Sequence, residues 1–197
     1  MSTSNKFALN LGLAHLNESV IVEIGSSRTK KFEDSSTFFF EKISNKYNTD
    51  FFTIDFSEEV INSIPLKFTQ QKFHMSGEDF MKSFLTYSHK KIGLLYLDNF
   101  DIIYNEKHKK SLLSRVGGLY KNKNIELNNE NSAKTHLEQL ILSMKYLHDN
   151  AHVIIDDTSF RNNTWFGKGA LCVPYLLENG FQISFKDDEG IAFSKSI

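Results

Sequence analysis

Residues 92–97 read Ile92-Gly-Leu-Leu-Tyr-Leu97, the most apolar run of the chain, and an acid, Asp98, follows directly. A short, continuous apolar run of this kind is typical of a central parallel strand that helices cover on both faces. Further short apolar runs lie at 19–24, 51–54 and 152–155, and segments with helical periodicity separate them. Strands that alternate with helices predict an α/β fold built on a parallel sheet.

The end of the chain predicts a different connection. Residues 181–185 and 191–193 are rich in β-formers and flank Asp187-Asp-Glu-Gly190, a sequence that is typical of a hairpin turn. We therefore expect a Rossmann-like, doubly wound, mostly parallel seven-stranded sheet that closes with a C-terminal antiparallel β-hairpin. A further strand is expected at 67–74, and the main helices at 37–47, 78–87, 133–147 and 168–179, the third of them capped by Ser132.

The length of 197 residues favours a single domain. Residues 99–131 are polar, rich in Asn and Lys and weakly periodic, apart from a helical turn near 110–115. We expect this segment to be an insertion or lid on domain 1–197.

Composition and charge narrow the function classes. The 23 basic and 24 acidic residues leave a net charge of −1, which argues against a nucleic-acid partner, because sequence-independent binding of a polyanion needs a cationic face. Cys172 is the single cysteine, so a monomer has no internal disulfide or thiolate metal cage. Residues 1–17 are polar, unlike a signal peptide, and no apolar run approaches the roughly 20 residues that span a bilayer. A cytoplasmic protein with a small-molecule substrate and no membrane partner is expected.

Acids stand at nearly every predicted strand exit. Because ligands bind beyond the carboxyl ends of parallel strands, these residues are the candidate site: Glu23 and Gly25, Asp55, Glu78 and Asp79, Asp98, and Asp156 with Asp157. Gly25 permits a tight turn and close approach of a ligand. Asp55 either accepts hydrogen bonds from ribose hydroxyls or caps the next helix, and the two acids after Gly77 either contact an adenine amino group or stabilise a first helical turn.

Three of these carboxylates suggest a metal. Asp98, Asp156 and Asp157 would repel one another without a cation, and oxygen ligands suit Mg²⁺, Ca²⁺ or Mn²⁺. Alternatively, Asp157 caps the following segment and a single carboxylate points inward. His136, in the first turn of the helix at 133–147, is a base, a metal ligand or a polar surface residue.

Several segments together resemble class I S-adenosylmethionine-dependent methyltransferases. Within this superfamily they are similar to small-molecule O-methyltransferases of the macrocin, rhamnosyl and cephalosporin-hydroxylase-like types. The resemblance lies in VEIGSSR (22–28), EDSSTFFFEKI (33–43), FFTIDFS (51–57), GLLYLDNFD (93–101), HLEQLILSMKYLHDNAHVIIDDT (136–158) and GKGALCVPYLLENGF (167–181).

The resemblance implies roles for the strand-end residues. Glu23 and Gly25, with Ser26 beside them, would border the methionine part of S-adenosyl-L-methionine. Asp55 would bind its ribose, and Glu78 or Asp79 would lie near its adenine. The three remaining acids would hold Mg²⁺ or another divalent cation that chelates vicinal hydroxyls of the substrate: Asp98, Asp156 and Asp157.

One position departs from the family pattern. Where relatives read Asp-Gly-Asp-His, this chain reads Asp98-Asn99-Phe100-Asp101, so Phe100 replaces a candidate base. Asp98, Asp101 and His136 remain as catalytic candidates. The expected function is metal-assisted O-methylation of a hydroxylated small molecule or sugar, and the resemblance implies a homodimer. A non-catalytic cofactor-binding relative and a nucleotide-sugar-binding protein stay as alternatives.

Overall fold

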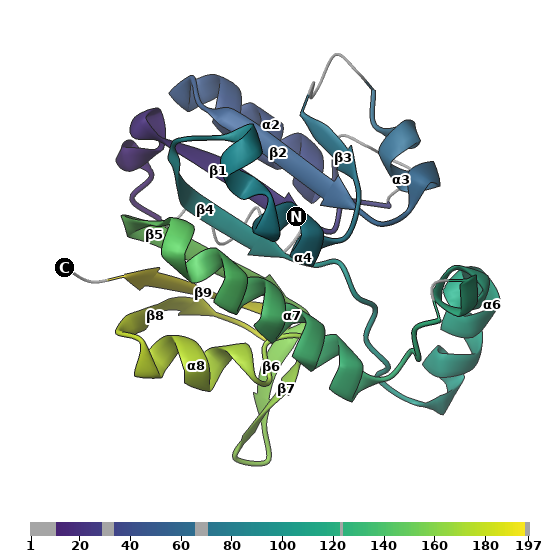
Figure 1. Ribbon diagram of the computed structural model, residues 1–197. Coiled ribbons are helices and arrows are strands. Elements are labelled where there is room, and N and C mark those ends of the chain that lie inside the picture. The colour runs from purple at the N-terminus through teal and green to yellow at the C-terminus, as the bar shows by residue number, and fades with distance from the viewer. Residues whose placement is uncertain (1–10, 29–33, 66–70, 123, 196–197) are drawn as a thin grey trace.

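The computed structural model describes residues 11–28, 34–65, 71–122 and 124–195 (Figure 1). Its strands are β1 (Ser19–Ile24), β2 (Asp50–Asp55), β3 (Lys72–His74), β4 (Lys91–Leu97), β5 (Leu147–Asp156), β6 (Thr158–Arg161), β7 (Thr164–Gly167), β8 (Phe181–Lys186) and β9 (Gly190–Lys195). Its α-helices are α2 (Ser36–Tyr47), α3 (Glu58–Ser63), α4 (Gly77–Lys82), α5 (Phe84–Tyr87), α6 (Glu106–Asn122), α7 (Asn129–Ser143) and α8 (Cys172–Glu178). Two 3₁₀ helices are η1 (Ala14–Glu18) and η3 (Met144–Tyr146).

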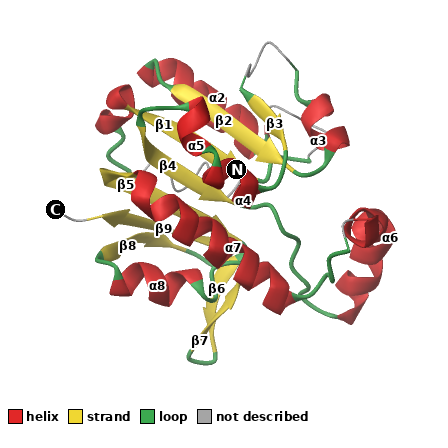
Figure 2. Cartoon of the chain, viewed as in Figure 1, coloured by secondary structure: helices red, strands yellow, loops and turns green. Residues whose placement is uncertain are grey.

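Seven strands form one sheet in the order β3-β2-β1-β4-β5-β9-β8. All neighbours pair in parallel except β9, which runs antiparallel to both β5 and β8. Helices cover both faces of this sheet (Figure 2). The predicted α/β class, the seven strands and the C-terminal antiparallel hairpin are therefore confirmed.

Alternation along β4 divides the core into two layers. Leu95 and Leu97 pack into the cluster that α4, α5, α7 and α8 complete. Leu94 and Tyr96 point to the other face, against α2 and η1. All four side chains are buried, and burial of a leucine side chain stabilises a fold by about 1.5–3 kcal/mol. This is why the apolar run at 92–97 specifies the central strand.

Helix α7 begins four residues before its predicted start. Its N-cap is Asn128, whose side chain accepts a hydrogen bond from the backbone N–H of Asn131 at 2.7 Å. Ser132, the predicted cap, lies inside the helix and is buried. Asparagine is at least as good a cap as serine, and it stands in extended backbone here.

The segment 99–131 contains a longer helix than predicted. Helix α6 has 17 residues, and its packing face repeats every fourth residue with Leu112, Val116 and Tyr120. These side chains form a small separate cluster with Phe100 and Leu127. So narrow an apolar stripe in an otherwise polar helix gives a weak periodic signal.

The hairpin β6–β7 was not predicted. Its turn residues Asn162 and Asn163 both have positive φ, 49° and 60°, the backbone that a two-residue type I′ turn requires. The next helix consequently begins at Cys172 rather than 168. The strand expected at 67–74 comprises Lys72–His74, and its earlier part lies in 66–70, outside the described residues. Among the described residues, no helix combines the length and apolar character needed to cross a bilayer.

At Gly25 the backbone after β1 lies very close to the backbone after β4, and a substitution there tests this close approach. Its φ is +100°, and a Cβ there would lie 2.4 Å from the backbone N of Asn99. We expect Gly25→Ala to destabilise the fold by about 2–4 kcal/mol in urea unfolding. Gly118→Ala is the matched control, because Gly118 is helical and a Cβ there meets nothing within 4 Å; it should gain roughly 0.5–1 kcal/mol. Equal stability of Gly25→Ala and wild type would contradict this close approach.

Candidate functional site

The sheet register aligns the strand exits in one row. Ile24 of β1 pairs with Ile54 of β2 and Leu97 of β4, and Leu97 pairs with Ile155 of β5. The residues that follow each of these partners are Asp55, Gly25, Asp98 and Asp156. The predicted acids at these exits therefore meet along one edge of the sheet.

Glu23 lies inside the fold behind this edge. Its side chain is fully buried, and its carboxylate accepts hydrogen bonds from Ser36 at 2.6 Å, Thr37 at 2.8 Å and Thr53 at 2.6 Å. Burial raises the pKa of Glu23 to about 7, although the three hydroxyl donors counteract part of that effect. Thr53 also bonds the hydroxyl of Ser26 at 2.6 Å. Glu23 thus joins β1, β2 and the start of α2, and its contact with a cofactor stays a prediction.

Asp55 keeps one carboxylate oxygen without a hydrogen bond. Oδ1 accepts from the backbone N–H of Ser57 at 2.7 Å, whereas Oδ2 is buried and has no hydrogen-bond partner in the described part of the chain. The cap of helix α3 is Ser57 itself, so Asp55 is not the cap. Burial raises the pKa of Asp55 to about 6, and Arg28, at 3.9 Å, opposes that shift.

Arg28, in the loop after β1, contacts the end of β2 and the loop after β4. Its guanidinium donates to Asp101 at 3.0 Å and lies 3.9 Å from Asp55. Tyr120 of α6 donates to the same oxygen of Asp101 at 2.9 Å and accepts from its backbone N–H at 3.0 Å. Asp101 is therefore already paired with a cation and a phenol.

Lys168 lies among the three carboxylates for which we predicted a metal. Its ammonium forms ion pairs with Asp98 and with Asp157, the latter at 2.8 Å. The lysine side chain is 3% exposed, and those of the two aspartates are 25% and 32% exposed. Burial alone would lower the pKa of Lys168, but the three carboxylates together raise it well above its ordinary value. The group therefore stays positively charged.

The predicted divalent cation at Asp98, Asp156 and Asp157 is not supported. The cation between these carboxylates is the lysine ammonium, and the described residues contain no group of His, Cys, Asp or Glu side chains arranged to hold a metal. A backbone turn at Gly167, with φ +97°, places Lys168 there, and its N–H donates to the carbonyl of Asp157 at 3.2 Å.

The third carboxylate of this group, that of Asp156, has a raised pKa. Burial, followed by repulsion from Asp98, raises the pKa of Asp156 to about 8. Tyr96 donates its hydroxyl to Asp156 at 2.9 Å. On the exposed side, the Tyr104 hydroxyl donates to Asp157.

His136 is not a surface residue. It is fully buried on α7, and its Nδ1 donates to the carbonyl of Ser132 at 2.7 Å. Burial, helped by the charge of Lys168, lowers the pKa of His136 to about 3. The imidazole is therefore neutral, and within the described chain its Nε2 has no hydrogen-bond partner.

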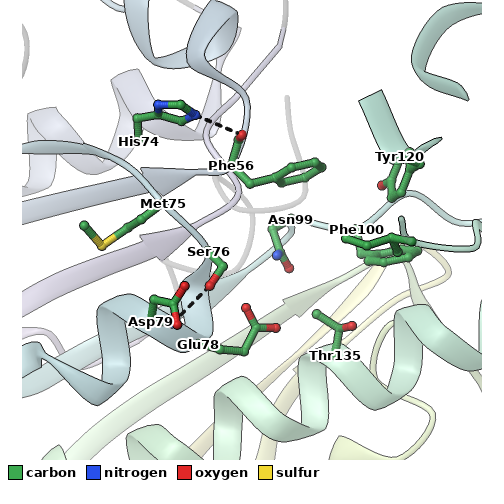
Figure 3. A pocket seen from close by; sticks show the side chains of 11 residues that line it. Phe56, His74, Met75, Ser76, Glu78, Asp79, Asn99, Phe100, Tyr120 and Thr135 are labelled. Carbon is green, nitrogen blue, oxygen red and sulfur yellow. Dashed lines mark hydrogen bonds between the residues drawn. The ribbon is translucent and has the colours of Figure 1, made fainter. Parts of the chain in front are cut away.

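A cavity of about 380 Å³ opens beside this edge (Figure 3). It is lined by Phe56, His74, Met75, Ser76, Glu78, Asp79, Asn99, Phe100, Tyr120, Ile125 and Thr135. Glu78 and Asp79 stand in the first turn of α4, and Glu78 accepts from Gln139 at 3.1 Å. Phe100 forms a wall of this cavity, with its ring 4.9 Å from that of Tyr120.

Three residues of the candidate site were not predicted from the sequence: Lys168, Tyr96 and Arg28. Lys168 has one usable signal, because it stands between Gly167 and Gly169, and glycines are common where a backbone turns tightly. Tyr96 was predicted as part of the apolar central strand and not as a site residue. Nothing in the local sequence marks Arg28 as the partner of Asp101, which lies 73 residues away.

No protein-family model matches the chain, and no curated protein is similar to it in sequence. Solved structures are similar to it in fold. One is a candidate ribosomal RNA methyltransferase of Plasmodium falciparum, at 12% identity, with a TM-score of 0.54 over 100% of this chain and 96% of the other. A second is SMU.1697c, a candidate methyltransferase of Streptococcus mutans in complex with S-adenosylhomocysteine, at 8% identity, with a TM-score of 0.53 over 100% and 99%. A third is the N-methyltransferase NodS of Bradyrhizobium japonicum, at 12% identity, with a TM-score of 0.50 over 98% and 96%. The fold is thus the class I methyltransferase fold.

The expectation of no nucleic-acid partner is corrected by this comparison. We based it on the balanced net charge and expected a small-molecule substrate instead. The Plasmodium protein named for ribosomal RNA shares this fold across nearly both chains, so a domain of this size without an added recognition domain does not exclude nucleic acid. Net charge also averages over the whole surface and says nothing about how charges are distributed.

The raised pKa of Glu23 predicts a pH dependence of stability. Between pH 4.5 and about 7 the folded protein holds a proton that the unfolded chain has released, so stability falls as the pH rises through this window. Glu23→Gln removes the titration. We expect the stability of wild type relative to Glu23→Gln to fall by about 2–3 kcal/mol across it. Urea unfolding at a series of pH values measures this difference, and the contributions of other titrating groups cancel because both proteins share them. A difference that stays constant or rises with pH would contradict a raised pKa of Glu23 in the folded protein.

The ion pairs of Lys168 predict how its substitution changes the stability of the fold. Lys168→Met leaves Asp98 and Asp157 without their cation, and we expect a loss of about 3–5 kcal/mol in stability. Magnesium chloride should then raise the melting temperature of Lys168→Met and leave that of wild type unchanged. Thermal unfolding followed by circular dichroism tests both proteins side by side. A wild-type melting temperature that rises specifically with Mg²⁺ would place a metal site beside Lys168 after all.

Proposed function

We propose that this protein is an S-adenosylmethionine-dependent methyltransferase that methylates an oxygen atom. The observation that carries the proposal is a cavity beside Asp55 and, on the same sheet edge, a carboxylate–ammonium cluster at Asp98 and Lys168. In open α/β sheets this edge is where ligands bind.

The cavity has the groups that an adenosyl moiety requires. Phe56, Met75 and Phe100 supply apolar walls for a purine, and Glu78 and Asp79 supply acceptors for an amino group. Asp55 directly precedes Phe56, and its buried Oδ2 accepts no hydrogen bond from the described chain. A ribose hydroxyl would satisfy it, since a carboxylate accepts from two vicinal hydroxyls. The S-adenosylhomocysteine bound to the Streptococcus mutans structure of this fold supports the same ligand.

The bound cofactor would supply an activated methyl group, so the protein's tasks are to align the acceptor and to manage its proton. Asp98 is a partly exposed carboxylate at the end of β4, and we propose it as the proton acceptor. Asp101 stays a second candidate for that role, although Arg28 and Tyr120 both donate to its Oδ2. His136 is too weakly basic and too deeply buried.

Lys168 favours oxygen as the acceptor atom. A hydroxyl becomes anionic as it loses its proton, and a fixed ammonium stabilises that charge. An amine acceptor becomes cationic and gains nothing from a buried lysine. The fold itself does not decide between them, since NodS, named as an N-methyltransferase, shares it. In this proposal the ammonium does what a divalent cation would otherwise do.

Binding of S-adenosylhomocysteine tests the proposal. Isothermal titration calorimetry should detect binding to wild type, and Asp55→Asn should weaken it by about 10–100-fold, because a charge-assisted bond to a hydroxyl is lost. Asp50→Asn is the matched control, since Asp50 stands at the opposite end of the same strand and pairs with Lys90 at 3.5 Å; its affinity should equal that of wild type. Wild type that binds neither S-adenosylhomocysteine nor S-adenosylmethionine, or that is stabilised by a nucleotide sugar instead, would overturn the proposal.

A further inference from the structure

Helix α6 concentrates positive charge in a chain whose net charge is −1. It carries four lysines and one arginine against a single acid, Glu106. Its packing side is the apolar stripe of Leu112, Val116 and Tyr120. Basic and acidic residues are nearly equal in number over the whole chain, whereas basic residues predominate on this helix.

The half of α6 that faces away from its apolar stripe is cationic. Four exposed side chains lie on it: Lys107, Lys110, Arg115 and Lys121. Among the described residues, none of these four takes part in a salt bridge, unlike Lys134 of α7, which pairs with Glu130 at 2.5 Å. The row from Lys107 to Lys121 is about 21 Å long, which is enough for several consecutive phosphates.

Three small residues and the exposed Leu113 lie between these cations. Ser111, Ser114 and Gly118 are exposed on the same helix, and a Cβ added at Gly118 would meet nothing within 4 Å. A backbone of phosphates and sugars can therefore approach the helix between the long side chains. Bulky or acidic residues in these places would have blocked or repelled it.

Helix α6 is placed next to the candidate site. It stands away from the sheet beyond the strand exits (Figure 1), and Tyr120 on its inner side lines the cavity. The loop that leads into it carries Asp101, which pairs with Arg28, and Tyr104, which bonds Asp157. The inner side of α6 therefore borders the cavity, and the loop before it contacts Asp157, which pairs with Lys168.

The hairpin β6–β7 adds an aromatic surface on the other side of that cluster. It begins one residue after Asp157 and ends one residue before Lys168. Phe160 is 50% exposed and lies 4.9 Å from the ring of Trp165, and Lys186 stands over both rings. Trp165 is half-buried against the core, so the exposed ring is that of Phe160, and an exposed aromatic ring beside a cation can stack with a nucleic-acid base.

We propose that the methyl acceptor is RNA, held by its phosphates along α6 and by a base stacked on Phe160, with a ribose hydroxyl presented to Asp98 and Lys168. The inference rests on the proposed function, whose hydroxyl acceptor it specifies. RNA offers what these surfaces need together: a row of anions, flat apolar bases, and the 2′-hydroxyl that distinguishes it from DNA. An acidic protein segment would match the lysines but would leave the aromatic platform without a partner.

Fluorescence anisotropy with a labelled single-stranded RNA of mixed sequence tests the surface, on the full chain saturated with S-adenosylhomocysteine. The α6 variant Lys107→Gln/Lys110→Gln/Arg115→Gln/Lys121→Gln should bind at least about tenfold more weakly than wild type, and the slope of log K against log salt should flatten by about 3. The charge-matched control changes four exposed lysines elsewhere, Lys42, Lys46, Lys145 and Lys195, to Gln. It should bind like wild type.

Phe160→Ala separates stacking from charge. It should weaken RNA binding by about fivefold and leave the salt slope unchanged, because stacking releases no counterions. Poly-glutamate should not displace the RNA; displacement at equal charge would assign α6 to an acidic protein instead. With labelled S-adenosylmethionine, label should enter RNA and not the DNA of the same sequence.

Three results would overturn the RNA proposal: no binding by wild type, equal losses in the two charge variants, or affinity that does not depend on salt. Calorimetry with S-adenosylhomocysteine on the same preparations keeps the two proposals apart. Binding of S-adenosylhomocysteine without binding of RNA refutes the RNA surface alone, whereas absence of both refutes the methyltransferase proposal. Circular dichroism of each variant shows that the helices have been retained.

Discussion

The ammonium of Lys168 is buried against Asp98 and Asp157 at the ends of β4 and β5, and the acid-rich edge of the sheet depends on it. Three carboxylates this close could not all be ionised in a partly buried place without a cation, because each charge raises the pKa of the others. Even with the lysine, Asp156 has its pKa raised to about 8. A buried charge costs several kcal/mol unless its partners are well placed, and the turn at Gly167 provides that placement.

The same edge ties the fold to the site. Parallel register sets the exits of β1, β2, β4 and β5 in one row, and Glu23 secures the row from inside through three hydroxyls of β2 and α2. Arg28, in the loop after β1, holds the row together from the solvent side. It pairs with Asp55 at the end of β2 and with Asp101 in the loop after β4. Polar groups of the site are thus structural as well as chemical, so substitutions there act on stability and ligand binding together.

The distribution of charge explains why a nearly neutral chain can still have a cationic surface. Acids gather at the strand exits, where we propose that they bind a cofactor and accept a proton, and basic residues gather on α6, which packs on a separate small cluster around Phe100. Phe100 stands at the position for which we expected a candidate base. In this chain it forms a wall of the cavity and part of the support for α6.

Local sequence was enough for the sheet, its hairpin and the acids at its exits, because alternation, apolar length and turn residues are properties of neighbouring positions. It was also enough to bring Asp55, Asp98 and Asp156 together, since parallel strands end at the same edge. It could not reveal that Lys168 takes the place of a metal, that His136 is buried and neutral, or that Arg28 pairs with Asp101. Those outcomes join segments up to 73 residues apart, and they depend on turn geometry and packing that exist once the whole chain has folded.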